Sequence, residues 1–73
     1  MIREHDTVVL TRALPEWGLR VGDVGAVVHT HDGVAYEVEF ASGGGRVLAV
    51  VTLTADDVRP VADAEILHVR ALS

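Results

Sequence analysis

Apolar residues occur along the chain in short runs that are separated by residues typical of turns. The runs cover residues 7–11, 24–30, 35–41, 46–53 and 58–60 and are rich in Val, Thr, Leu and Ala. Their length and β-branched content are typical of strands. In the third run, Tyr36, Val38 and Phe40 alternate with Glu37 and Glu39, which predicts one buried and one exposed face. The pattern therefore predicts an all-β domain of about five short antiparallel strands.

The connections between these runs favour one arrangement of the strands. Pro15 disfavours a helix at Leu14, so residues 12–20 are expected to form an irregular loop. The tetrapeptide Gly22-Asp23-Val24-Gly25 is typical of a tight turn that enters a strand, and residues 54–57 predict a single 3₁₀ turn. A short strand, a long loop and a Gly-Asp-Val-Gly turn into a second strand are how a small SH3-like barrel begins. The predicted fold is that barrel.

The chain divides into a barrel over residues 1–61 and a C-terminal extension over residues 62–73. In the extension, Leu67 and Val69 alternate with His68 and Arg70, which favours a strand. A helix remains the alternative, because Ile66 and Val69 are three residues apart and Asp63 is a suitable cap. The extension is expected to pack on the barrel or on a partner subunit.

The register of the two central hairpins follows from the need to bury their apolar faces and to keep charges out of the core. A three-residue connection over residues 32–34 meets this requirement in the first hairpin, whereas a two-residue loop would bury Glu37. The predicted partners are Val28–Val38, Ala26–Phe40 and Thr30–Tyr36 in the first hairpin, and Val47–Phe40 and Ala49–Val38 in the second.

This register places three large apolar residues, Val27, Leu48 and Val50, on the outer face of the barrel. We interpret them as a contact surface covered by the C-terminal extension, by a second copy of the chain or by a separate protein. Trp17, beside Pro15 in the first loop, is either a further anchor for a partner or a cap on one end of the barrel.

His29 lies opposite Glu37 in the predicted register, with His31 one step further along the same outer face. Imidazole and carboxylate groups are ligands for zinc or nickel, so these three residues are weak candidates for a metal site. An exposed polar face with a cross-strand His–Glu pair is the favoured interpretation, because two His residues one position apart often occur by chance and no fourth ligand is evident. We predict no metal and no other cofactor.

Composition narrows the functional classes. The 73 residues include eleven acidic and six basic residues, all six of them Arg, and no Cys, which gives a net charge of −5. A negative surface repels phosphate backbones, so nucleic acid is an unlikely partner. No Lys is present, and Gly43 to Gly45 precede a predicted strand rather than the helix that a phosphate loop requires. We therefore predict a protein that is not an enzyme.

The chain shows no targeting signal. Its first six residues are polar where a signal peptide needs an apolar stretch, and no apolar run approaches the roughly 20 residues of a membrane span. A cytoplasmic protein without membrane contact is expected.

The motif D-T-V-V-L-T-R-A-L-P-E-W-G-L-R-V-G-D-V-G, followed by A-Y-E-V-E-F and V-V-T-L-T-A-D-D-V-R-P-V, resembles a family of very short bacterial proteins of unknown function. The segments G-D-V-G-A-V-V and Y-E-V-E-F are more distantly similar to photosystem I reaction-centre subunit IV and to the nitrile hydratase β subunit. These resemblances imply an SH3-like barrel that docks on a larger partner. Genes of the first family lie in places beside suspected toxin genes, which implies an antitoxin or immunity role.

The leading hypothesis is a protein-binding module, such as an antitoxin-type inhibitor or an adaptor of a protein encoded nearby. An acidic, compact protein is suited to block a basic active site, because complementary charge speeds the encounter. The alternative is a self-assembling structural module, as a homodimer or larger homo-oligomer. A nucleic-acid-binding barrel is the third hypothesis.

Overall fold

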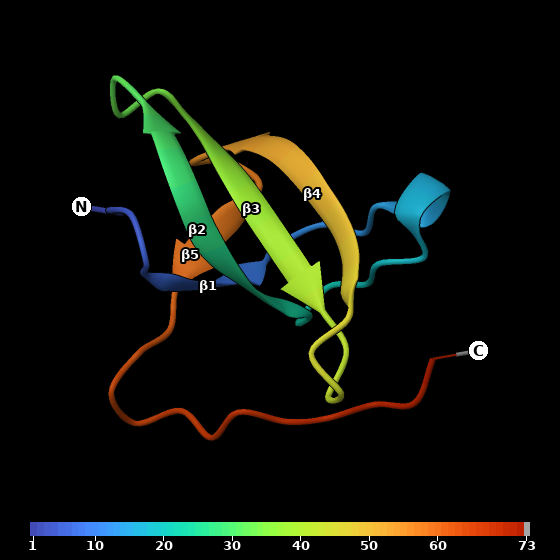
Figure 1. The fold of residues 1–73 in the computed structure, drawn as a ribbon. Coiled ribbons are helices and arrows are strands. Elements are labelled where there is room, and N and C mark those ends of the chain that lie inside the picture. The colour runs from blue at the N-terminus through green and yellow to red at the C-terminus, as the bar shows by residue number, and fades with distance from the viewer. Residues whose placement is uncertain (73) are drawn as a thin grey trace.

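A computed structural model describes residues 1–72 of the chain, and five strands make up most of it. They are β1 (Thr7–Leu10), β2 (Val24–His31), β3 (Ala35–Ala41), β4 (Val47–Thr54) and β5 (Val58–Pro60). The strands form one open sheet in the order β4-β3-β2-β1-β5, and every neighbouring pair is antiparallel (Figure 1). The predicted all-β class with five antiparallel strands is confirmed, and each predicted strand agrees with the structure to within one residue at either end.

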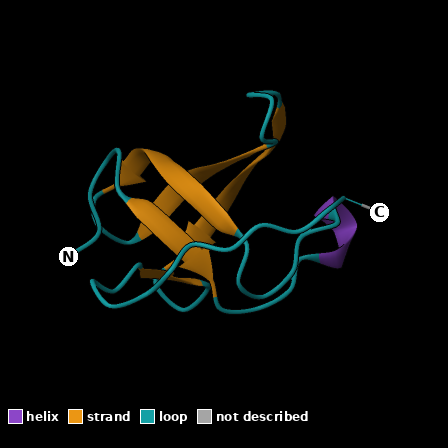
Figure 2. Ribbon diagram, turned by 90° about the horizontal axis from the view of Figure 1, so that it is seen from below, coloured by secondary structure: helices purple, strands orange, loops and turns teal. Residues whose placement is uncertain are grey.

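The long loop between β1 and β2 contains one short 3₁₀ helix, η1 (Pro15–Trp17), shown in purple in Figure 2. Pro15 occupies its first turn, where the missing N–H costs nothing. Leu14 and Leu19 pair across the base of the helix and are both buried, so they attach the loop to the core. The turn predicted after β4 is also present, because the Asp57 N–H donates to the Thr54 carbonyl at 2.9 Å.

The β2–β3 hairpin has the predicted three-residue connection. Asp32 and Gly33 both have positive φ, at 55° and 72°, which are backbone conformations that Asp tolerates and Gly favours. Beyond this turn Thr30 pairs with Tyr36, as predicted.

A β-bulge in β2 makes two predicted pairs of this hairpin, Val28–Val38 and Ala26–Phe40, wrong. The register shifts between Val27 and His29, so that Val27 pairs with Val38 in place of Val28. Val27 is completely buried and Val28 is 42% exposed. The bulge has a steric reason at Gly25, where a Cβ would lie 2.9 Å from the Phe40 ring. Only a glycine fits beside that ring, so Gly25 rather than Ala26 occupies the inner position.

The predicted pairing of β3 with β4 is displaced by two residues. Phe40 pairs with Ala49 rather than Val47, and Val38 pairs with Val51 rather than Ala49. A displacement by two preserves the inward face of Ala49, but the predicted inward position of Val47 is wrong, because Val47 pairs with Ala41 and is 51% exposed. One step of this displacement comes from a β3–β4 connection one residue longer than predicted, and the other comes from a second bulge at the start of β4, opposite the step from Phe40 to Ala41.

The core lies on the concave side of the sheet and consists of aliphatic side chains with two aromatic rings. Its buried members are Ile2, Val8, Leu10, Leu14, Leu19, Val27, Tyr36, Val38, Phe40, Leu53 and Val58. No polar or charged residue is buried among the residues that the structure describes. The small core suits a chain of this length, which buries only about 60% of its unfolded surface.

The C-terminal segment, which we define as residues 61–72, is neither the predicted strand nor a helix. It leaves β5 as an extended chain, crosses one end of the sheet and finishes near the β1–β2 loop (Figures 1 and 2). The Glu65 N–H donates to the Ala62 carbonyl, and none of residues 66–72 has a backbone hydrogen bond within the described chain. A strand was therefore the wrong prediction, since no sheet edge lies alongside this segment. The predicted extension also included residue 73, which lies outside the described residues.

Candidate functional site

The C-terminal segment is held to the sheet at two points, and the first is at its beginning. Arg59 of β5 forms a bidentate ion pair with Glu65, with both N–O distances at 2.7 Å. The Ala62 N–H donates to the same carboxylate, also at 2.7 Å. The Arg59 guanidinium lowers the pKa of Glu65 to about 2 from its ordinary value of 4.5. The segment thus begins in a fixed turn beneath β5.

Arg70 forms the second anchor at the other end of the segment. Its Nε donates to Asp23 Oδ1 at 2.8 Å and its Nη2 to Asp23 Oδ2 at 2.6 Å. The same Nη2 donates to the Gly18 carbonyl at 2.9 Å. Asp23 also accepts the Arg20 N–H, and the pKa of its carboxyl is lowered, chiefly by the hydrogen bond from Arg70. This pair is the least exposed ion pair among the described residues, with side chains 26% and 16% exposed.

Between the anchors, the segment bridges a cleft of about 540 Å³ at the end of the sheet. Leu19, Phe40 and Leu48 line the cleft from the sheet and loop side, and Val69 and Leu72 line it from the segment. The lining is thus largely apolar, with the Asp23–Arg70 ion pair at one margin. The segment and the sheet are therefore joined by charged contacts at two points rather than by a continuous apolar interface.

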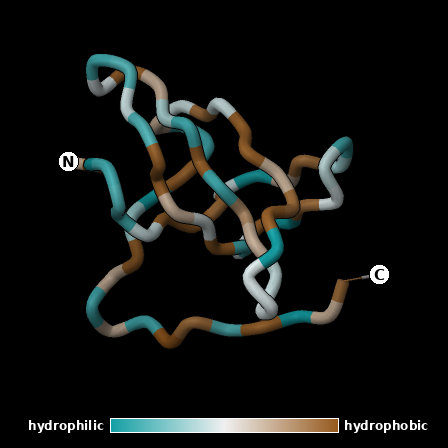
Figure 3. Tube along the Cα trace, viewed as in Figure 1, coloured by the Kyte–Doolittle hydropathy of each residue, from teal (hydrophilic) through white to brown (hydrophobic). Residues whose placement is uncertain are grey.

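The apolar side chains of the C-terminal segment face solvent. Ile66 is 92% exposed and Val69 88%, while Leu67 and Leu72 are 60% and 55% exposed. Figure 3 shows the C-terminal segment at the bottom of the view, with brown apolar stretches interspersed with hydrophilic ones. We call these four residues the C-terminal apolar surface. Exposed apolar side chains on a segment that ion pairs hold in place are typical of an interaction site.

Trp17 lies near the anchored end of this surface. It is the last residue of η1 and is 49% exposed, and Arg70 contacts the carbonyl of the next residue, Gly18. About half of the surface of this residue is thus available to a partner.

The other predicted contact residues do not form one surface. Val27 is fully buried opposite Val38, so its prediction as an outward contact residue is wrong. Leu48 is 37% exposed and lines the cleft, whereas Val50 is 47% exposed and pairs with Glu39. The physical reason is the pair of bulges, which turn Val27 inward and displace Leu48 from the regular alternation.

The predicted histidine face is present on β2. His29 pairs with Glu37 in the register, as predicted, but the contact to the carboxylate comes from His31, whose Nε2 lies 2.8 Å from Glu37 Oε2. Thr52 of β4 donates to the same oxygen at 3.0 Å, and both contacts lower the pKa of Glu37. His29 instead approaches Glu4, with Nδ1 3.5 Å from Oε2. Within residues 1–72 no three His, Cys, Asp or Glu side chains are placed to hold a metal ion.

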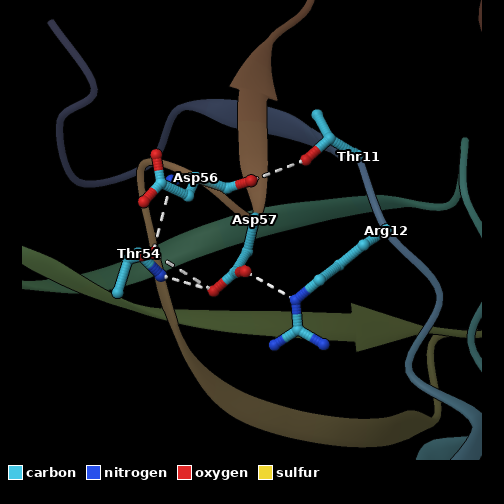
Figure 4. A network of polar contacts seen from close by, with 5 residues as sticks. All are labelled: Thr11, Arg12, Thr54, Asp56 and Asp57. Atoms are coloured by element: carbon cyan, nitrogen blue, oxygen red, sulfur yellow. Dashed lines mark hydrogen bonds and ion pairs between the residues drawn. The ribbon is translucent and has the colours of Figure 1, made fainter.

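A separate polar network closes the turn between β4 and β5 (Figure 4). Asp57 accepts the Thr54 N–H at 3.0 Å and pairs with Arg12 at 2.6 Å, which lowers the pKa of its carboxyl. The Thr11 hydroxyl donates to the Asp56 carbonyl at 2.9 Å. The network ties the β1–β2 loop to the turn and leaves the Asp56 carboxylate without a cation among the described residues.

Comparison with known proteins identifies the sheet as a family domain. A family model described as "Domain of unknown function (DUF4926)" matches residues 4–60. The chain belongs to this family. The predicted membership of a family of unknown function is thereby confirmed, and the C-terminal segment lies beyond the matched residues. No curated protein and no solved structure matches the chain. Within residues 1–72, no helix is long and apolar enough to cross a membrane.

The anchor at Arg70 was not predictable from the sequence of the DUF4926 chain. Arg70 and Asp23 are 47 residues apart, and Asp23 lies within the matched residues whereas Arg70 lies beyond them. Asp23 was recognised only as a turn residue, and Arg70 only as a polar position in an alternating tail. The sequence offers no local signal that these two side chains meet.

We expect Arg70→Ala to release the C-terminal segment while leaving the sheet folded. Asp23 and the Gly18 carbonyl would lose their shared donor, and no backbone hydrogen bond would hold residues 66–72. Heteronuclear NMR relaxation should show order parameters of these residues falling to flexible values, below about 0.6. Arg3→Ala, which removes an arginine without an ion pair in the described chain, is the matched control and should leave them ordered.

The same anchors make the position of the segment dependent on acid pH. Asp23 and Glu65 have lower pKa values when the segment is anchored, so their contribution is complete above about pH 5. This contribution decreases as the pH falls below the ordinary pKa values of the two carboxyl groups. It disappears once the pH is below their pKa values in the anchored state, which for Glu65 is about 2. The relaxation measurement repeated at pH 7 and at about pH 2 should show a more mobile segment at the lower pH. Equal mobility at both would exclude these carboxylates as anchors.

Proposed function

We propose that this protein is a protein-binding module that captures its partner through the C-terminal apolar surface. The observation that carries the proposal is the exposure of four large aliphatic side chains on a segment that two ion pairs hold in place. Exposure of Ile66 and Val69 near 90% leaves most of their transfer free energy available to a complex. At about 25 cal/mol per Å² of apolar area, burying such side chains contributes about 1.5–3 kcal/mol each.

Anchoring adds to this affinity in a second way. A free tail would lose conformational entropy on binding, at about 1–2 kcal/mol for each residue fixed. The Glu65 and Arg70 ion pairs hold the backbone of the segment before a partner arrives, so part of that entropy is already lost. Trp17 lies beside the Arg70 anchor and supplies an aromatic side chain of the type enriched at interface hot spots.

Charge indicates the chemistry of the partner. The chain carries a net charge of −5, and three of its six arginines are already paired with carboxylates. A basic protein surface therefore suits it best, since complementary potential raises the association rate and excludes acidic competitors. An inhibitor or adaptor of a basic partner, including an antitoxin-type inhibitor that covers a basic active site, fits these properties. A binding role of this kind does not require the protein to catalyse a reaction.

A self-assembling structural module is the second candidate. The observation that favours it is the uncharged, unpaired edge of β4.

The proposal predicts which substitutions abolish partner capture. The tagged protein should retain a stoichiometric basic protein from cells of its source, and the double variant Ile66→Asp/Val69→Asp should lose it. The matched control is Val34→Asp, which places the same charge on a 71% exposed valine in the β2–β3 turn. Quantitative mass spectrometry of the captured proteins makes the comparison. A partner retained equally by the double variant would show that binding occurs elsewhere.

A further inference from the structure

The two edges of the sheet are protected to very different extents. β5 has three residues, and among them Arg59 adds a charge and Pro60 lacks an N–H donor. Short strands, charges and prolines are the usual devices that keep sheet edges from pairing. β4 has eight residues, V-L-A-V-V-T-L-T, with neither a charge nor a proline. One edge of this sheet is therefore blocked and the other is open.

The open edge of β4 has no other strand beside it. β3 is its one neighbour in the sheet, and beyond β3 the β4 backbone accepts one further hydrogen bond in the described chain, from Asp57 to the Thr54 carbonyl. Val47 and Val50 are about half exposed along the strand. A long, apolar edge of this kind is a template for pairing with another strand.

The charges at the two ends of β4 indicate which strand. Arg46 immediately precedes β4 and Asp56 follows it, and neither side chain forms an ion pair among the described residues. In an antiparallel pair of two identical β4 strands, the beginning of each strand meets the end of the other. Arg46 of each copy then lies near Asp56 of the other, whereas a parallel pair would place like charges together. The ends of β4 are thus complementary to those of a second copy.

Side-chain alternation selects the register of that pair. Ala49, Val51 and Leu53 face the core, and Val50 and Thr52 face outward. Inner residues oppose inner residues only when the two-fold axis passes through a residue, since a slip by one position mixes the faces. With the axis at Val51, Ala49 opposes Leu53 and Val50 opposes Thr52, so the regular residues 49–53 pair with one another. An axis at Val50 would instead place Thr52 against the bulged residue Leu48, so the regular stretch of β4 favours Val51.

We propose that the free edge of β4 pairs with β4 of a second copy around a two-fold axis at Val51, which joins two five-stranded sheets into one. The second bulge falls at Leu48 and leaves residues 49–53 regular for this pairing. The interface is isologous, so each of its contacts occurs twice. Leu48 of β4 lines the same cleft as Val69 and Leu72, so this interface adjoins one end of the C-terminal apolar surface, while Ile66 and Leu67 lie outside that cleft.

Charge reversal tests the proposal without disturbing the core. Sedimentation equilibrium of the full chain should show a dimer, and Arg46→Glu or Asp56→Arg should weaken it by about two- to thirtyfold, because two exposed ion pairs per dimer are lost. The double variant Arg46→Glu/Asp56→Arg recreates both pairs in reverse and should restore the original dissociation constant. Circular dichroism verifies that each variant is folded, and Arg3→Glu is the control for a charge reversal away from β4.

Two further variants test the edge and its axis. Val50→Lys places a charge on the edge and should give a monomer, while Val28→Lys, on a valine of similar exposure within β2, should not. Because the chain contains no Cys, Val51→Cys gives a single thiol, which should form an intermolecular disulfide across the axis, whereas Thr54→Cys should not.

A monomeric wild-type chain at every concentration would overturn the proposal. So would a dimer that persists in Val50→Lys or that the double charge reversal fails to restore, because its interface would lie elsewhere. A monomer whose capture of a different protein is lost in Val50→Lys would assign the edge to a heterologous strand and equally overturn it. None of these results bears on Ile66→Asp/Val69→Asp, so the two proposals fail separately.

Discussion

Gly25→Ala is expected to reduce the free energy of unfolding by roughly 1–3 kcal/mol, the usual cost of overpacking a filled core. A Cβ at this position would lie 2.7 Å from Val38 Cγ1, 2.9 Å from Phe40 Cε1 and 3.0 Å from the Glu39 carbonyl oxygen. Val38 and Phe40 are almost completely buried, so neither side chain has an empty space into which to move. Single domains are typically stable by about 5–15 kcal/mol, so this loss is a large fraction of the total for a short chain.

Gly43→Ala is the matched control for this substitution. A Cβ at Gly43, in the β3–β4 turn, meets no atom within 4 Å. We expect its free energy of unfolding to stay within about 0.5 kcal/mol of the wild type. Urea denaturation followed by circular dichroism gives both values. If Gly25→Ala proved as stable as Gly43→Ala, β2 and β3 could not be packed as described.

Val27→Ala is expected to cost about 2 kcal/mol, and Val28→Ala less than about 0.5 kcal/mol. Val27 is completely buried opposite Val38, so truncation removes two buried methyl groups and leaves a cavity. Val28 lies in the bulge with 42% of its surface exposed, so less burial is lost. The two substitutions are chemically identical and adjacent in the sequence.

The comparison therefore measures the position of the β2 bulge directly. Urea denaturation of both variants against the wild type is sufficient, with equal m-values as the check that the unfolded states are comparable. A larger loss of stability in Val28→Ala than in Val27→Ala would mean that Val28 is the buried residue, as a regular alternation predicts. That result would contradict the bulge.

The strands and their order of connection could be predicted from sequence because each depends on local chemistry. β-branched runs, the Asp32–Gly33 turn and Pro15 each determine the conformation of their own few residues. The bulge in β2 depends instead on the space around the Phe40 ring of β3. Gly25 of β2, 15 positions earlier in the sequence, must leave that space open. Two neighbouring valines, Val27 and Val28, give no local indication of which one faces inward.

The candidate site was only partly predictable for the same reason. Trp17 was recognised from its place beside Pro15, and the structure leaves half of it exposed. The alternation of apolar and polar residues in the C-terminal segment was visible, but it predicted a strand, because sequence does not show whether an edge is available for pairing. The Asp23–Arg70 anchor joins residues with no relation along the chain. This ion pair fixes the end of the C-terminal segment and so holds its exposed apolar side chains in place.

The affinity of the captured partner tests the central claim, that the anchored C-terminal segment is the binding surface. Isothermal titration calorimetry of the purified partner against the wild type, Ile66→Asp/Val69→Asp and Val34→Asp supplies three dissociation constants. Losing two buried aliphatic contacts, at about 1.5–3 kcal/mol each, predicts at least about a hundredfold weaker binding for the double variant. Val34→Asp should bind like the wild type. Equal affinity of the double variant and the wild type would contradict the account.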